Sequence, residues 1–259
     1  MRYSLPKGMR YSTLSERKSF YQDDFSPRKV SRWLRKREGH TVLAVIIGRH
    51  TKLYPKRFSQ NFSKTILIDE YSNLEEVRRL LLIFQPESVY YDRTVYSEGL
   101  RGSRRVLGQE LAFDLDPENL TCPIHGSLKD KMRRGQGLSF CTLEFRMVKE
   151  KTLSLYERLA EFFSDLSVVY SGRGFHVHIL DSEALTWTRG KRRKLAMQMK
   201  REGYPIDVWV TTGGMRLIRL PYSLHGMVSR IVVPLDVGEL ERFDPVKSRI
   251  CLPRFLKKA

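Results

Sequence analysis

The sequence predicts an α+β fold with a mostly antiparallel sheet, and three observations support this class. Strand-like apolar runs come in pairs, as on either side of the turn at 171–174. Helix-like segments intervene irregularly, whereas a doubly wound parallel sheet needs a helix after nearly every strand. A composition of 41% hydrophobic and 11% aromatic residues supports a real core.

The individual elements follow from apolar periodicity and from start and stop signals. Ser26-Pro27, for example, is typical of a helix start, because proline fits the first helical position. Helices are expected at 26–37, 75–84, 148–166 and 189–202, with a polar loop at about 117–139. Strands are expected at 41–48, 65–69, 88–96, 110–116, 206–210, 217–220 and 228–235, and as a pair within 168–180.

The charge of the chain is strongly positive. Its 47 Lys and Arg residues outnumber 29 Asp and Glu residues, which gives a net charge of +18. Such an excess favours a polyanionic partner through long-range steering and counterion release. A merely soluble basic protein and an anionic membrane surface are the alternatives, although no basic amphipathic helix with a bulky apolar face is evident.

The sequence also predicts an intracellular setting. No run approaches the roughly 18 apolar residues of a membrane span, and the N-terminus lacks the apolar core of a signal peptide. The three cysteines are odd in number and too few for a disulfide framework. The chain length of 259 residues allows one large domain or two small ones.

Two carboxylates, Asp114 and Asp116, close the apolar run that begins at Glu110. On a strand, residues two apart share a face, so these side chains would lie side by side. Adjacent carboxylates repel unless a cation lies between them, and Mg²⁺ or Mn²⁺ prefers oxygen ligands. An aspartate that simply ends a strand in a turn is the alternative.

Three further segments carry polar groups. The turn at 171–174, Ser-Gly-Arg-Gly, allows close approach to an anion and precedes His176 and His178, which share a strand face. Asp207 interrupts an apolar run, where a lone acid needs a cation or donors. In the stretch from 216 to 225, Arg219 and His225 are the expected triphosphate contacts. The alternatives are an ordinary hairpin turn, a structural salt bridge and solvent-facing arginines.

Together these segments resemble the archaeo-eukaryotic primase superfamily, specifically the catalytic small subunit of DNA primase. Asp114-Leu-Asp116 after Phe113 resembles the family's first metal motif, and Ile206-Asp207-Val208 resembles the third. The stretch from Ser171 to His176 resembles the second motif, whose serine and histidine hold the incoming nucleotide. Residues 216–225 are similar to the family's Arg-Leu-Pro-x-Ser-x-His stretch. The order and spacing agree over about residues 15–235.

The resemblance implies a nucleotidyltransferase that makes short RNA or DNA primers from nucleoside triphosphates on a single-stranded DNA template. It implies a flattened, RRM-like catalytic palm flanked by helices, within one domain over 1–259. A primer strand and a large primase subunit are the implied partners. The implied ligands of Mg²⁺ or Mn²⁺ are Asp114, Asp116 and Asp207. The implied nucleotide-binding residues are Ser171, Arg173, Gly174, His176, Arg219 and His225.

Two details depart from the family pattern. Cys122-x₂-His125 and Cys141-x₂-Glu144, within 117–145, have the paired spacing of a zinc knuckle, but a structural zinc site containing glutamate is unusual. Ordinary core cysteines and a surface histidine are the alternative. The insertion between the second and third motifs is short and basic, at 181–204, and its positive residues are expected to follow a template backbone. A solvated helix face is the alternative there.

Two other functions stay open at this point. A repair or mobile-element polymerase of the same superfamily would extend ends rather than initiate. A nucleic-acid-binding protein without catalysis would use its acids structurally. Asp114, Asp116 and Asp207 argue against a protein that only binds nucleic acid, because such a protein has no need for carboxylates beside a phosphate path.

Overall fold

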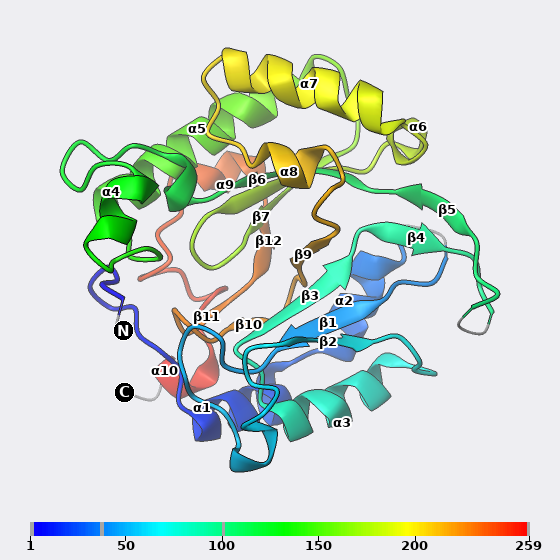
Figure 1. Cartoon of the computed structure of the whole chain (residues 1–259), viewed down its shortest axis with the longest axis vertical. Helices are drawn as coiled ribbons and strands as arrows, with labels where there is room; N and C mark the ends of the chain where they lie inside the picture. The colour runs from blue at the N-terminus through cyan, green and yellow to red at the C-terminus, as the bar shows by residue number, and fades with distance from the viewer. Residues whose placement is uncertain (1–2, 37–38, 100–101, 258–259) are drawn as a thin grey trace. The chain divides into compact units, whose positions relative to one another are not determined.

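The computed structural model describes residues 3–36, 39–99 and 102–257, and it forms two compact units that alternate along the sequence (Figure 1). The first unit comprises Met1–Met9, Gln109–Arg216 and Pro234–Asp244. The second unit comprises Arg10–Gly108, Leu217–Val233 and Pro245–Ala259. Each unit contains a four-stranded sheet.

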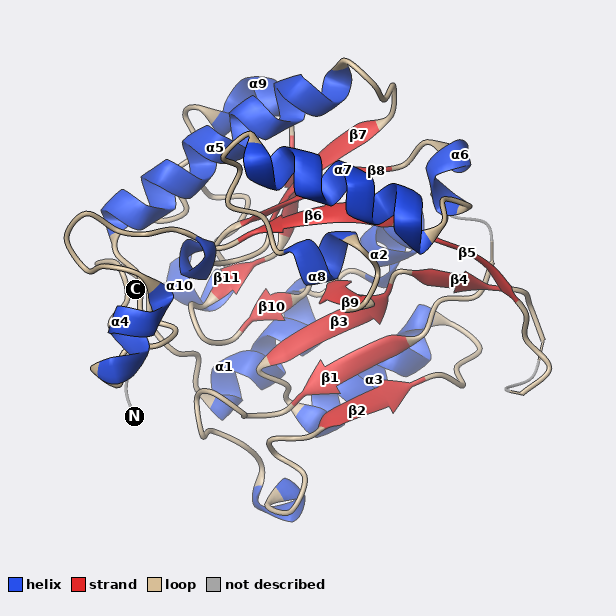
Figure 2. Ribbon diagram, turned by 45° about the horizontal axis from the view of Figure 1, so that its top comes forward, coloured by secondary structure: helices blue, strands red, loops and turns tan. Residues whose placement is uncertain are grey.

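The sheet of the first unit has the strand order β12-β7-β8-β6, and Figure 2 labels its strands β7, β8 and β6. Its strands are β6 (Leu111–Leu115), β7 (Leu166–Tyr170), β8 (Phe175–Ile179) and β12 (Val233–Leu235). The central strand β8 is buried along its length and pairs antiparallel with both β6 and β7. Alternating apolar residues of these strands, such as Phe113 and Val177, form the core of this unit.

Helices cover this sheet and hold its connections. The long helix α5 (Thr142–Ala160) packs on β7 and β8, and the short helix α8 (Val208–Thr211) packs on β6 and on α7 (Arg189–Arg201). The other helical segments of the unit are η3 (Pro117–Asn119), α4 (Leu128–Arg133), α6 (Ser182–Leu185) and α9 (Val237–Leu240).

The sheet of the second unit has the strand order β2-β1-β3-β9 and is antiparallel throughout. These strands are β1 (Leu43–Ile46), β2 (Thr65–Ile68), β3 (Ser88–Asp92) and β9 (Leu217–Arg219). Two short hairpins, β4 (Thr94–Tyr96) with β5 (Val106–Gln109) and β10 (Leu224–His225) with β11 (Arg230–Ile231), complete the strands. The helical segments are α1 (Leu14–Ser19), η1 (Phe20–Asp24), α2 (Pro27–Leu34), η2 (Lys56–Phe58), α3 (Leu74–Phe84) and α10 (Arg254–Lys257).

The predicted class, α+β with mostly antiparallel sheets flanked by helices, is confirmed. The hairpin around the turn at 171–174 forms as predicted, with Tyr170 opposite Phe175. The basic stretch forms α7 as predicted. The first predicted helix ends earlier than expected, since α2 ends at Leu34, and the expected end at 37 lies outside the described residues.

One prediction was wrong at the site itself, because 206–210 is not a strand. Asp207 instead caps the short helix α8, and its side chain accepts hydrogen bonds from the amides of Trp209 and Val210. The β-branched run suggested a strand, but the aspartate cap decided the local structure.

Other boundaries also differ, each for a local reason. The expected loop at 117–139 contains α4, which begins with a capping box between Ser127 and Asp130. The helix expected at 148–166 begins earlier, because Cys141 and Glu144 form a second capping box. The strand expected at 88–96 breaks where the Asp92 side chain accepts a hydrogen bond from the Thr94 amide. The strand expected from 228 begins later, because Ser229 has a positive φ of 52°.

None of the described helices is long and apolar enough to cross a membrane.

Candidate functional site

Asp114 lies beside His176 because of the strand register in the first unit. The β6–β8 pairing places the two residues directly opposite each other, and His176 Nε2 lies 3.5 Å from Asp114 Oδ1. His176 is 4% exposed, whereas Asp114 is only partly buried. Asp116 follows the end of the strand and is also partly buried. The strand therefore presents two acids at one end, with an imidazole next to the first.

Asp207 is brought to the same strand by a backbone hydrogen bond. Its amide donates to the carbonyl oxygen of Asp114 over 2.9 Å, and α8 packs on β6. The helix cap uses Oδ1 of Asp207, which accepts from Trp209 N at 2.8 Å and from Val210 N at 3.4 Å. A cation at Asp207 would therefore bind the other carboxylate oxygen, Oδ2.

The three acids do not form a closed ligand cage by themselves. Among the described residues, one group of His, Cys, Asp or Glu residues is close enough to hold a metal ion, and it does not include the three acids. This group consists of Cys122, His125, Cys141 and Glu144, whose ligand atoms all lie within 4.8 Å of one another. An open set of carboxylates suits Mg²⁺ or Mn²⁺, because such ions keep water ligands and bind substrate phosphates directly.

The glycine-containing turn lies against the acidic end of β6. A Cβ atom at Gly174 would lie 2.1 Å from the carbonyl oxygen of Leu115 and 2.4 Å from Asp116 Oδ1, so only glycine fits there. Gly172 adopts a φ of 109°, a conformation that L-residues rarely tolerate. The Ser171 hydroxyl oxygen accepts from the Gly174 amide at 3.2 Å and is buried. These contacts fix the turn beside Asp116.

Arg173 is held by Glu118, a residue that the sequence reasoning missed. Nη1 and Nη2 of Arg173 donate to the two carboxylate oxygens of Glu118, each at 2.8 Å. Burial lowers the pKa of the guanidinium, but the charges of Glu118 and Asp116 outweigh burial and raise it above its ordinary value. The predicted triphosphate contact of Arg173 therefore stays a prediction, since Glu118 holds the guanidinium in this structure.

A buried hydrogen-bonded pair of side chains lies next to His176. His178 Nδ1 is 2.5 Å from Glu110 Oε1, and neither side chain is more than 1% exposed. The rings of His176 and His178 meet edge to face, with centroids 5.6 Å apart. The shared face of the two histidines was predicted, but Glu110 as the partner was not. A buried acid just before an apolar run was the available signal.

Arg219 and His225, the other predicted triphosphate contacts, belong to the second unit. Arg219 pairs with Tyr90 across β9 and β3, and its guanidinium lies over the Tyr90 ring at 5.0 Å from the centroid. His225 is 2% exposed and pairs with Arg230 across β10 and β11. Their roles as triphosphate contacts stay predictions.

The predicted zinc ligands Cys122, His125, Cys141 and Glu144 do come together. Cys122 Sγ lies 3.4 Å from His125 Nδ1, close to the separation of two ligands on one tetrahedral zinc ion. Burial raises the pKa of the Cys141 thiol, so loss of its proton would accompany metal binding. The donor set and spacing therefore fit zinc.

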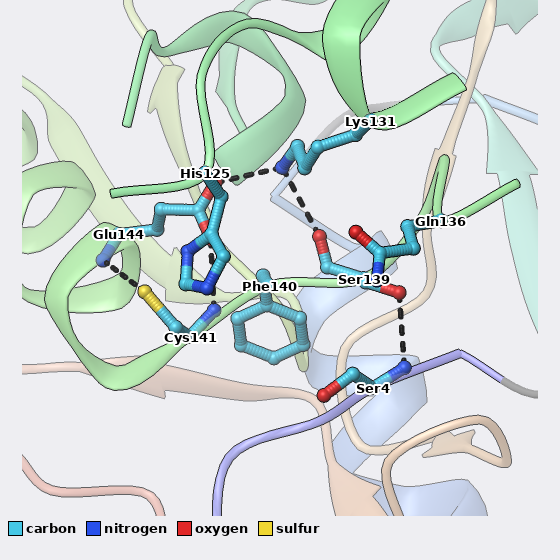
Figure 3. Close-up of a pocket in the computed structure, with 8 residues that line it drawn as sticks. All are labelled: Ser4, His125, Lys131, Gln136, Ser139, Phe140, Cys141 and Glu144. Carbon is cyan, nitrogen blue, oxygen red and sulfur yellow. Dashed lines mark hydrogen bonds and ion pairs between the residues drawn. The ribbon is translucent and has the colours of Figure 1, made fainter. Parts of the chain in front are cut away.

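Lys131 is an unpredicted neighbour of this group, and Figure 3 shows it between Glu144 and Ser139. Its ammonium donates to Glu144 Oε1 at 2.7 Å and to the Ser139 carbonyl at 3.1 Å, and it is 2% exposed. The other oxygen of Glu144 accepts from the Cys141 amide at 2.8 Å. A zinc ion would share the Glu144 carboxylate with Lys131, beside a cavity of about 70 Å³.

Comparisons with known proteins point to one family. No family model matches the chain. An uncharacterized DNA primase small subunit-like protein of Archaeoglobus fulgidus is 51% identical over 99% of this chain and 95% of that protein. The DNA primase small subunit PriS of Pyrobaculum calidifontis is 28% identical over 66% of this chain and 67% of its own length. PriS of Pyrococcus furiosus is 26% identical over 72% of this chain and 48% of its own length.

A solved structure shares the fold. The polymerase domain of Mycobacterium tuberculosis ligase D, in complex with DNA, superimposes with a TM-score of 0.56 at 15% identity. The match covers 95% of this chain and 88% of that domain.

The Glu118–Arg173 pair gives a pH-dependent prediction. Burial alone would raise the Glu118 pKa, but the Arg173 charge and hydrogen bonds lower it below its ordinary value of 4.5. Because the pKa of Glu118 is lower in the folded protein than in the unfolded chain, ionised Glu118 contributes its full stabilisation above pH 4.5. This contribution is lost as the pH falls through the pKa of Glu118 in the folded protein. At pH 7, Glu118→Gln should therefore reduce the free energy of unfolding by on the order of 3 kcal/mol.

Urea denaturation at several pH values checks this prediction. The difference between wild type and Glu118→Gln should shrink as the pH falls below 4.5. Glu157→Gln, which changes an exposed acid on α5, should have little effect at any pH. A wild-type advantage that stays constant across the acid range would contradict the proposed role of the ion pair.

Proposed function

The chain belongs to the archaeo-eukaryotic primase small-subunit family, and from this we propose that it is a DNA primase catalytic subunit. Its activity is template-directed transfer of nucleotides from nucleoside triphosphates to a growing primer. One observation of the structure carries the proposal. The Asp207 amide, from a distant part of the sequence, bonds the Asp114 carbonyl, so the third acid joins the first two at one strand end.

In the proposed mechanism, Asp114, Asp116 and Asp207 hold the catalytic cations, Mg²⁺ or Mn²⁺. When bound, two such ions would lower the pKa of the primer 3′-hydroxyl and neutralise charge on the triphosphate and the leaving pyrophosphate. His176, whose Nε2 lies 3.5 Å from Asp114 Oδ1, would donate a hydrogen bond to a phosphate oxygen. Phosphoryl transfer needs mainly this positioning and charge neutralisation.

The turn and the helix α7 contribute in separate ways. Gly174 lets the turn approach Asp116 closely, and Arg173 supplies a fixed positive charge near the acids. On α7, Arg192 is buried and bonds the carbonyls of Gln109 and Glu110. The exposed basic residues of α7 other than Lys191, which is paired with Glu183, are available for phosphates of a template strand: Arg189, Arg193, Lys194, Lys200 and Arg201. A large primase subunit as a partner remains a prediction.

Replacing the metal-binding acids should abolish incorporation while leaving the fold intact. Asp114→Asn and Asp207→Asn keep the side-chain shape but remove the charge. We expect incorporation to fall by more than about 100-fold, since even residues that only support metal ligands cost 10- to 100-fold. Glu157→Gln, an exposed change on α5, should retain wild-type activity.

The assay uses a single-stranded template, labelled ribo- and deoxyribonucleoside triphosphates and Mn²⁺, with and without a supplied primer. Products made without a primer indicate initiation, and products made only with one indicate an extending polymerase. Equal incorporation by wild type and Asp114→Asn would rule out the proposed catalysis and leave nucleic-acid binding alone.

We further propose that Cys122, His125, Cys141 and Glu144 hold a structural zinc ion. Lys131→Met tests this, because it leaves the Glu144 carboxylate buried without its cation. In the presence of a chelator the loss of stability should be on the order of 3–5 kcal/mol. Added zinc should recover much of that loss, because the metal then neutralises Glu144.

Thermal denaturation with a chelator or with zinc measures this effect, and metal analysis gives the stoichiometry. Lys129→Met, an exposed change on the same helix α4, is the matched control. Less than about half an equivalent of tightly held zinc in the wild type, or an equal loss in Lys131→Met with and without zinc, would rule out this site.

A further inference from the structure

Trp209 is exposed two residues after the metal-binding Asp207. Its side chain is 59% exposed, although tryptophan usually buries most of its surface. Its backbone amide donates to Asp207 Oδ1 at 2.8 Å, so the indole and the third acid are attached to the same turn of α8. An exposed indole at this position has no role in the core and none in the proposed metal chemistry.

One face of the indole is covered by backbone rather than by side chains. A Cβ atom at Gly214 would lie 2.9 Å from Cε2 of Trp209 and 3.1 Å from Cδ2. These two atoms form the bond shared by the two rings, so the Gly214 backbone meets the flat face and not the ring edge. Because more than half of the side chain is exposed, the opposite face is open to solvent.

The loop after α8 holds the backbone of Trp209 in place. The amides of Gly214 and Met215 both donate to the Trp209 carbonyl oxygen, each at 3.1 Å. The amide of Thr212 donates to the carbonyl of Val208 at 3.0 Å. Because the backbone of Trp209 is already ordered, it loses little conformational entropy when a ligand binds to the open face. This small entropy cost favours binding.

Phe162 is the other large aromatic side chain exposed among the described residues, and it lacks this arrangement. Phe162, also exposed in the first unit, is covered by the Arg158 guanidinium at 4.8 Å from its ring centroid. Trp209 instead presents a flat open ring on a rigid backbone, in a strongly basic protein. Nucleobases stack on such aromatic platforms without sequence preference, because every base has a π face.

We propose that the open face of Trp209 stacks on a nucleobase of the substrate held at Asp114, Asp116 and Asp207. The inference rests on the proposed function and adds a base-binding platform to it. The base belongs either to the nucleic-acid strand or to the incoming nucleotide, and the two sources share this chemistry.

Binding measurements without turnover test the platform. Wild type, Trp209→Phe, Trp209→Leu and Phe162→Leu are titrated with oligothymidylate, with an abasic oligonucleotide of equal length and with a nucleoside triphosphate, all in Ca²⁺. Trp209→Leu should bind the base-containing ligand about 10-fold more weakly or worse, and Trp209→Phe should stay within about threefold of wild type. Affinity for the abasic strand and affinities of Phe162→Leu should be unchanged.

Tryptophan fluorescence gives a second readout. The base-containing ligand should quench wild-type emission, and most of that quenching should disappear in Trp209→Phe. If Trp209→Leu binds the oligonucleotide more weakly than wild type does, Trp209 stacks on a base of the strand. If Trp209→Leu binds the triphosphate more weakly, Trp209 stacks on the base of the incoming nucleotide. Unchanged affinity of Trp209→Leu for both ligands, in a protein whose thermal denaturation matches wild type, would overturn the proposal.

These outcomes are independent of catalysis. If the wild type incorporates no nucleotide but Trp209→Leu binds the base-containing ligand more weakly, only the polymerase proposal is refuted. If the wild type incorporates nucleotides but Trp209→Leu has the same affinity as wild type, only the stacking proposal is refuted.

Discussion

The hydrogen bond from the Asp207 amide to the Asp114 carbonyl, 2.9 Å long, is the constraint on which the candidate site depends. Residues far apart in sequence meet there, at the end of a buried strand. The bond forms because Asp207 begins a helix, and its extended backbone conformation turns the amide outward towards β6. The same aspartate thus caps α8 with one oxygen and remains available to a cation with the other. The cap of α8 and the proposed cation site therefore share one side chain.

Two ion pairs and one hydrogen-bonded pair, all buried or nearly buried, lie in the same unit as this constraint. Glu118 holds Arg173 beside Asp116, Lys131 bonds Glu144 at the cysteine pair, and Glu110 bonds His178. Each of the two ion pairs places a charge where desolvation would be unfavourable without its partner. Fixed charges of this kind do not need to reorganise when a highly charged triphosphate binds. The proposed site therefore combines an open set of carboxylates with rigidly held neighbours, which suits positioning of a substrate rather than covalent chemistry.

The sequence predicted features that depend on short spacing. The hairpin at 171–174 and the knuckle residues are local patterns, and the structure places them as expected. Of the predicted acid pair, Asp114 lies on β6, whereas Asp116 follows the end of the strand. Asp207 was expected on a strand because its neighbours are β-branched, but one cap outweighed their preference. Glu118 and Lys131 could not be predicted, because ion pairs between distant segments leave no periodic signal. For His178, the acid before the apolar run of β6 was a signal, but nothing in the spacing identified Glu110 as its partner. The exposed ring of Trp209 could not be predicted either, because its contact with the Gly214 backbone depends on how the loop after α8 folds.

Counting bound Mn²⁺ shows whether the three acids of the first unit bind the catalytic cations, as proposed. Zinc-loaded protein would be titrated with Mn²⁺ in the presence of a non-hydrolysable nucleoside triphosphate, with free Mn²⁺ followed by electron paramagnetic resonance. We expect about two tightly bound ions per chain in the wild type, and at least one fewer in Asp114→Asn and Asp207→Asn. The same number of bound ions in the wild type and both variants would show that these acids do not hold the cations.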